Sequence, residues 1–96
     1  MQLLANYLED ARRERFSPDI EYIARFWDCS QETAKEICRR TMRVVDYESV
    51  VIIIERIFDY AKQGVALPPI DDLEFYKGTR HLIGWTPGTE ALKRTV

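Results

Sequence analysis

The sequence predicts a mainly α-helical fold, a small bundle of about four helices followed by an irregular C-terminal arm. Apolar residues recur at the helical period in several separate segments, and helix-capping residues stand where those segments begin or end. The chain has 96 residues, 46% hydrophobic and 31% charged, which is typical of one globular domain. We therefore expect a helical core over residues 1–66. An arm rich in proline, glycine and aromatic residues should follow over residues 67–96 and pack on that core.

The first predicted helix covers residues 3–11 and ends near Phe16. Its apolar residues keep the helical period, and three arginines follow, where cations suit the helix macrodipole. Ser17 is then a candidate cap for a second helix, with Pro18 at the first helical position and Asp19 in the first turn. These stop and start signals agree, so a boundary between two helices is expected here.

Two short apolar stripes lie on either side of a three-residue break at residues 28–30. Each stripe has the spacing i, i+3, i+4, i+7, which places its members on one face of a helix. The break is so short that the two helices must meet at a tight turn. The stripes consist of Ile20, Ile23, Ala24 and Trp27 before the break, and Ala34, Ile37, Cys38 and Thr41 after it.

The segment Ile20–Arg43 resembles the helix-turn-helix family of DNA-binding proteins, with the motif at about residues 18–43. The family has a small residue where its two helices cross, and Ala24 matches this position. Asp28 stands where the family usually has glycine, and aspartate tolerates a positive φ better than most residues. Ser30 can cap the second helix. Further matches to the family's apolar or small positions are Trp27, Cys29, Ala34 and Ile37.

The resemblance implies a small transcriptional regulator that lays the helix from Ser30 to Arg43 in the major groove of double-stranded DNA. Gln31 could read adenine through its amide and Lys35 could read guanine, while arginines meet phosphates. Glu32 and Glu36 oppose this hypothesis, because each brings a negative charge to the groove. The candidate DNA-binding residues are Ser30, Gln31, Lys35, Arg39, Arg40, Arg43 and Arg25. An equally open alternative is a purely structural helical corner.

The distribution of charge is uneven along the chain. The net charge is −2 and the sequence pI is about 5.4, whereas DNA-binding domains are often basic. Residues 11–43 hold eight basic and six acidic residues, a balance of +2; residues 44–76 hold two and seven, or −5. Residues 77–96 hold four and one, or +3. One positive face is therefore conceivable, although such charges commonly do no more than solvate helix surfaces.

A fourth helix is expected after Arg43, capped by Asp46 and ended by Gly64. Its first half is apolar almost all round, and the run Val50–Ile54 would also suit a buried strand. We favour the helix, because charged residues fall between the later stripe positions. Such a helix is either the centre of the bundle or, through Val50–Phe58, the interface of a homodimer.

The C-terminal arm offers a second function. Residues 75–85 could form a hairpin around Gly78, and thereby a wing beside DNA, or an irregular arm packed on the bundle. Its aromatic residues could instead anchor a protein partner. The alternative function is therefore a non-enzymatic interaction module, of the kind found among accessory or inhibitor proteins of phages and plasmids. Its candidate partner-binding residues are Phe75, Tyr76, Leu82 and Trp85.

Enzymatic motifs are missing from the sequence. It has no glycine-rich phosphate loop, and His81, its one histidine, lacks an identifiable catalytic partner. We therefore expect a non-enzyme without a cofactor or metal. Cys29 and Cys38 are interpreted as small buried residues of a reducing, cytoplasmic compartment rather than as a disulfide. The longest apolar run is too short to cross a membrane, so no membrane contact is expected.

Overall fold

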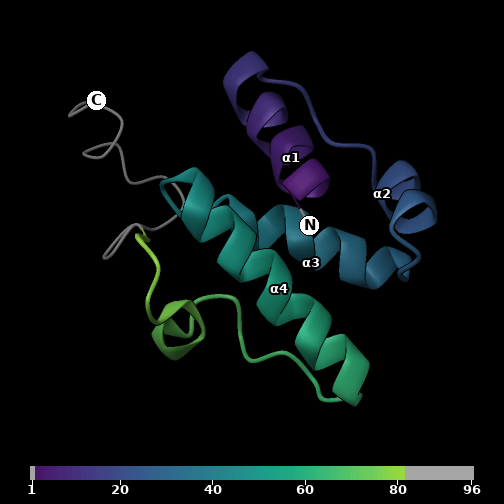
Figure 1. Ribbon diagram of the computed structural model, residues 1–96. Helices are drawn as coiled ribbons and strands as arrows, with labels where there is room; N and C mark the ends of the chain where they lie inside the picture. Colours follow the sequence, from purple (N-terminus) through teal and green to yellow (C-terminus); the bar gives the residue numbers. More distant parts are fainter. Residues whose placement is uncertain (1, 82–96) are drawn as a thin grey trace.

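The computed structural model describes residues 2–81 (Figure 1). This part of the chain contains four α-helices and one short 3₁₀ helix, and it has no β-strand apart from a single isolated bridge. The mainly helical fold is therefore confirmed. In chain order the elements are α1 (Gln2–Glu14), α2 (Ile20–Phe26), α3 (Gln31–Thr41), α4 (Tyr47–Gln63) and η1 (Leu73–Tyr76).

The start of α2 differs by two residues from the prediction. The helix begins at Ile20, and its cap is Asp19, whose carboxylate accepts the backbone N–H of Tyr22 at 3.2 Å. Ser17 was wrongly expected to be the cap, and Pro18 precedes the cap instead of opening the helix. Asp19 forms the same hydrogen bond that was assigned to Ser17 and lies where the chain leaves its extended conformation.

The other helix boundaries agree with the sequence signals. Ser30 accepts the backbone N–H of Thr33 at 3.0 Å, and Asp46 accepts that of Ser49 at the same distance. Gly64 ends α4 in the left-handed conformation, with φ of 69°. Helix α4 spans Val50–Ile54, so the alternative of a buried strand there is wrong.

The turn between α2 and α3 has the geometry expected of its sequence. Asp28 adopts a positive φ of 53°, a conformation that glycine adopts most readily. The turn is closed by a hydrogen bond of 2.9 Å from the backbone N–H of Cys29 to the carbonyl oxygen of Ala24. Ala24 packs against the core beside this turn. A small residue there lets α2 and α3 approach closely, which fixes their relative direction.

Helix α4 is the centre of the bundle. It contacts both α1 and α3, and the chain beyond it turns back alongside it toward its first turn (Figure 1). Val50, Ile53, Ile54 and Ile57 are fully buried, and the outer apolar residues Val51 and Ile52 are partly buried. The wide apolar surface of α4 is therefore largely covered within one protomer, and little of it at Val50–Phe58 remains for a second copy to cover.

The described part of the returning segment, up to residue 81, shows no hairpin, which was one expectation for residues 75–85. Residues 73–76 are a 3₁₀ helix capped by Asp72, and the chain then pairs with the α3–α4 connection through one antiparallel bridge between His81 and Val44. A backbone hydrogen bond of 2.7 Å from Val45 to the carbonyl of Arg80 supports this bridge. The remainder of the expected hairpin, with Leu82 and Trp85, lies outside the described residues.

Candidate nucleic-acid interface

Helix α3 presents three polar side chains along one outer face. Gln31, Lys35 and Arg39 are four residues apart, so they form one row along the helix surface, and all three are exposed. The opposite face of α3 packs into the core through Ala34 and Ile37, which are fully buried. The row therefore begins in the first turn after the α2–α3 turn and faces away from the bundle. We call Gln31, Lys35 and Arg39 the α3 row.

Both cations of the α3 row are paired with carboxylates of the same helix. Lys35 lies 3.6 Å from Glu32, and Arg39 donates to Glu36 at 3.1 Å. Exposed pairs of this kind contribute about 0–1 kcal/mol, because water screens them and holding both side chains costs entropy. Either cation can therefore exchange its carboxylate for a phosphate at little cost.

Arg40 does not belong to the exposed surface, and the expectation that it contacts phosphate is wrong. Only 4% of it is exposed, compared with 60% of the Arg39 side chain. Its guanidinium donates to Glu36 at 2.7 Å and to the carbonyl of Pro68 at 2.5 Å. It also lies over the ring of Phe75 at 4.7 Å from the centroid. Arg40 thus joins α3 to the segment that follows α4 and is a structural residue.

The remaining candidates occupy different places. Ser30 is exposed, but its hydroxyl oxygen is used as the cap of α3. Arg43 is half-buried, with its guanidinium 6.0 Å from the centroid of the Tyr76 ring. Arg25 is exposed in the last turn of α2, outside the α3 row. The structure thus brings together three of the seven candidates on one open face, and a fourth, Ser30, stands at its beginning.

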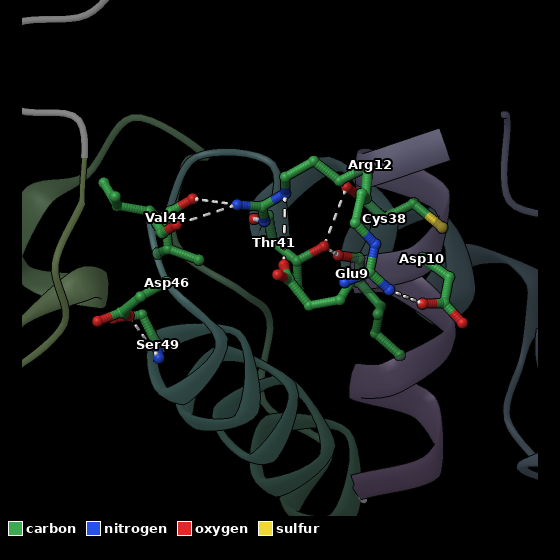
Figure 2. Close-up of polar contacts among 11 residues, drawn as sticks. Glu9, Asp10, Arg12, Cys38, Thr41, Val44, Asp46 and Ser49 are labelled. Atoms are coloured by element: carbon green, nitrogen blue, oxygen red, sulfur yellow. Dashed lines mark hydrogen bonds and ion pairs between the residues drawn. The ribbon is translucent and has the colours of Figure 1, made fainter. Parts of the chain in front are cut away.

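The far end of α3 is held by a residue that the sequence did not mark for this role. The Arg12 guanidinium of α1 donates to the carbonyls of Thr41 at 2.7 Å, Val44 at 3.0 Å and Val45 at 3.3 Å (Figure 2). Carbonyls at the C-terminus of a helix lack partners within the helix, and a cation suits the macrodipole there. From the sequence alone, the charge of this arginine is assigned to the C-terminus of α1 itself. Nothing in the neighbouring sequence indicates that the C-terminus of α3 lies beside α1.

The expected aromatic anchors of the C-terminal arm are part of the core. Phe75 is 4% exposed and Tyr76 is 2% exposed. The Tyr76 hydroxyl donates to the carbonyl of Ile70 at 2.5 Å. Both residues are therefore excluded as surface anchors for a partner protein, and Leu82 and Trp85 lie outside the described residues. Within residues 2–81, the exposed aromatic residues lie in the first third of the chain, at Phe16, Tyr22 and Phe26.

Both cysteines are free, but they are only partly buried, whereas the sequence predicted buried residues. Burial raises the pKa of the Cys38 thiol to about 11, and burial together with the neighbouring Asp28 raises that of Cys29. Both thiols are therefore protonated at neutral pH, which disfavours nucleophilic chemistry. Residues 2–81 contain no cluster of His, Cys, Asp and Glu suited to a metal ion. Within the same range, every helix is too short or too polar to cross a membrane.

Comparison with protein-family models, with curated proteins and with solved structures finds no match to this chain.

Proposed function

We propose that this protein binds double-stranded DNA through α3 and acts as a small transcriptional regulator. The observation that carries the proposal is the α3 row, three exposed polar side chains on the helix that follows the tight α2–α3 turn with its positive φ at Asp28. A helix of this exposure fits the major groove, which admits one α-helix. The resemblance of the sequence to the helix-turn-helix family gives independent support.

The contacts that hold α3 in the fold favour a helix rigid enough to recognise bases. Its first turn is fixed by Asp28 and Ser30, its inner face is buried, and its last carbonyls are held by Arg12. Contacts to bases need a helix whose position does not vary by more than a fraction of an ångström, because hydrogen bonds weaken steeply with misplacement. Each of these three sets of contacts restricts the motion of α3 in the DNA-free protein.

Each residue of the α3 row is assigned a contact with DNA. Gln31 suits adenine, because its amide can both accept and donate on the major-groove edge. Lys35 suits guanine or a nearby phosphate, and Arg39 suits phosphate. The Glu32 side chain is 83% exposed and would repel phosphate unless it accepts from a cytosine amino group. The protein should therefore bind non-specific DNA weakly and discriminate strongly.

The experiment is selection of duplexes from a random pool at low salt, followed by titration of the enriched site with four variants. Arg39→Ala should weaken all sequences alike and reduce the salt slope by about 0.9. Gln31→Ala and Lys35→Ala should relax the preference at one base pair, a loss of about 1–3 kcal/mol of discrimination. Arg13→Ala, which removes an exposed cation of α1 that pairs with Asp10, is the matched control and should leave affinity unchanged.

The proposal fails if the folded protein enriches no sequence. It also fails if Arg13→Ala and Arg39→Ala have equal effects, because binding would then depend on overall charge and not on the α3 row.

A second candidate function is favoured by one observation. Phe16, Tyr22 and Phe26 are exposed together on the α1–α2 connection and on α2, and patches of exposed apolar side chains commonly mark protein interfaces. An interaction module would use these residues and not the buried Phe75 and Tyr76. The two functions are compatible if the partner is a second copy, since helix-turn-helix proteins commonly bind as dimers that span two half-sites.

A further inference from the structure

Aromatic side chains form a continuous row across α1, the connection to α2, and α2 itself. Ring centroids are 5.9 Å apart between Tyr7 and Phe16, 5.4 Å between Tyr7 and Tyr22, and 5.6 Å between Tyr22 and Phe26. Trp27 continues the row at 4.6 Å from Phe26. Tyr7 and Trp27 pack against the core, whereas the other three rings are exposed. We call Tyr7, Phe16, Tyr22, Phe26 and Trp27 the α2 aromatic surface.

The α2 aromatic surface is larger than the interior requires. Ile23 alone of α2 is fully buried and fixes the helix to the core, so Tyr22 and Phe26 are not needed for that purpose. Exposed rings that lie in contact with one another are costly to leave in water, and aromatic residues dominate the energetics of interfaces. The surface is therefore suited to being covered by another molecule.

Two charged residues flank the exposed rings on α2. Glu21 and Arg25 are both exposed and four residues apart, so they lie on one side of the helix next to Tyr22 and Phe26. Within residues 2–81 neither side chain makes a hydrogen bond or an ion pair. The Glu21 carboxylate and the Arg25 guanidinium thus lie beside two exposed rings on α2, and neither has a partner among the described residues of its own protomer.

This arrangement is complementary to itself. If a second α2 packs antiparallel across a two-fold axis near residues 23 and 24, residue 21 of one copy faces residue 25 of the other. The dimer then contains two symmetry-related Glu21–Arg25 ion pairs between the copies and two symmetry-related contacts between Tyr22 and Phe26. A two-fold interface repeats every contact in this way, because the same patch serves both subunits.

We propose that this protein forms a homodimer through the α2 aromatic surface, with α2 antiparallel to its copy and Glu21 paired to Arg25 across the axis. Arg25 is then a dimer contact and not a phosphate contact. The inference does not rest on DNA binding, because none of its contacts involves the α3 row.

Charge exchange tests the pairing directly. Glu21→Arg creates two like-charged encounters in the dimer, as does Arg25→Glu, so each variant alone should dimerise roughly tenfold more weakly. The double variant Glu21→Arg with Arg25→Glu restores both pairs and should recover the dimer. A mixture of the two single variants should form a heterodimer, because one chain then carries two bases and the other two acids. Sedimentation velocity measures all four.

Phe26→Ser provides a test independent of charge. It removes a ring that is 59% exposed, so the protomer should keep its helical circular dichroism while the dimer dissociates roughly a hundredfold more easily. Val65→Ser, which removes another exposed apolar side chain beyond α4, is the matched control and should dimerise as the original chain does.

A protein that is monomeric at hundreds of micromolar overturns the proposal. A dimer that survives every α2 variant also overturns it and directs attention to α4. If Phe26→Ser dissociates the dimer but the two single charge variants do not pair with each other, the antiparallel arrangement is wrong. None of these results bears on DNA binding, which is measured separately with variants of the α3 row.

Discussion

The aromatic residues of α1 and α2 differ from those of the C-terminal segment in how much of each ring the fold covers. Phe26 is 59% exposed and stacks mainly on neighbouring aromatic rings, whereas Phe75 is 4% exposed and lies among Tyr60, Tyr76 and Arg40. The same residue type thus has a surface role in one region and a core role in the other. The difference follows from position, because Phe75 lies on the segment that returns along the central helix.

The comparison teaches that an aromatic residue in an irregular segment is not thereby a surface residue. A four-residue helix such as η1 has little structure of its own, so burial of its rings is what holds it in place. Helix α2 has seven residues but is fixed by Ile23 and by the Asp19 cap at its start, which leaves Tyr22 and Phe26 free for further contacts.

The largest expected effect separates the two phenylalanines. Phe75→Ala should lower the free energy of unfolding by about 3–5 kcal/mol, because it leaves a cavity between η1 and α4. Phe26→Ala should cost less than about 1 kcal/mol in a monomer, since the ring is mostly in water already. Urea denaturation of both variants at a concentration that favours monomers measures the difference. Equal losses would show that the two regions do not differ as described.

A smaller difference is expected between the adjacent arginines Arg39 and Arg40. Arg40→Ala leaves the half-buried Glu36 carboxylate without its closest partner and the Pro68 carbonyl without a donor, at a cost of about 3 kcal/mol. Arg39→Ala removes only an exposed ion pair and should change stability by less than about 1 kcal/mol. Thermal or urea unfolding compares them, and a large loss for Arg39→Ala would mean that α3 has been oriented wrongly.

The smallest effect concerns the pH dependence of the C-terminal segment. Burial and the nearby Arg43 lower the pKa of His81 below its usual value of 6.5. The unfolded chain therefore takes up the proton first, so the free energy of unfolding should fall as pH drops below about 6.5 and level off below the folded pKa. His81→Gln should remove this part of the fall. An identical pH profile for the two proteins between pH 7.5 and pH 5 would contradict the assignment.

Much of the fold could be predicted from the sequence because its signals are local. Periodic apolar residues and the caps Ser30, Asp46 and Gly64 each depend on neighbours within one or two helical turns. The positive φ at Asp28 was also predictable, since the helix-turn-helix family that the sequence resembles usually has glycine at that position. The cap was predicted at Ser17 and lies at Asp19, because the side chains of both residues are of a type that caps helices and the two stand only two positions apart.

The candidate site was less predictable because its residues are sorted by contacts distant in sequence. Arg40 differs from Arg39 only through Pro68 and Phe75, which are about thirty residues away along the chain. Arg12 binds carbonyls that are equally remote. Helical phase could have raised the question for Arg40, since it lies three residues after the buried Ile37, but it could not name the partner.

The most direct test of the central claim is an NMR titration of the labelled protein with a selected duplex. Backbone amide signals and side-chain signals of Gln31, Lys35 and Arg39 should shift, because the α3 row is the proposed contact with DNA. Signals of Tyr22 and Phe26 should keep their positions, since the α2 aromatic surface is assigned to a second copy of the chain. Shifts concentrated on α2, with the α3 row unchanged, would contradict the account.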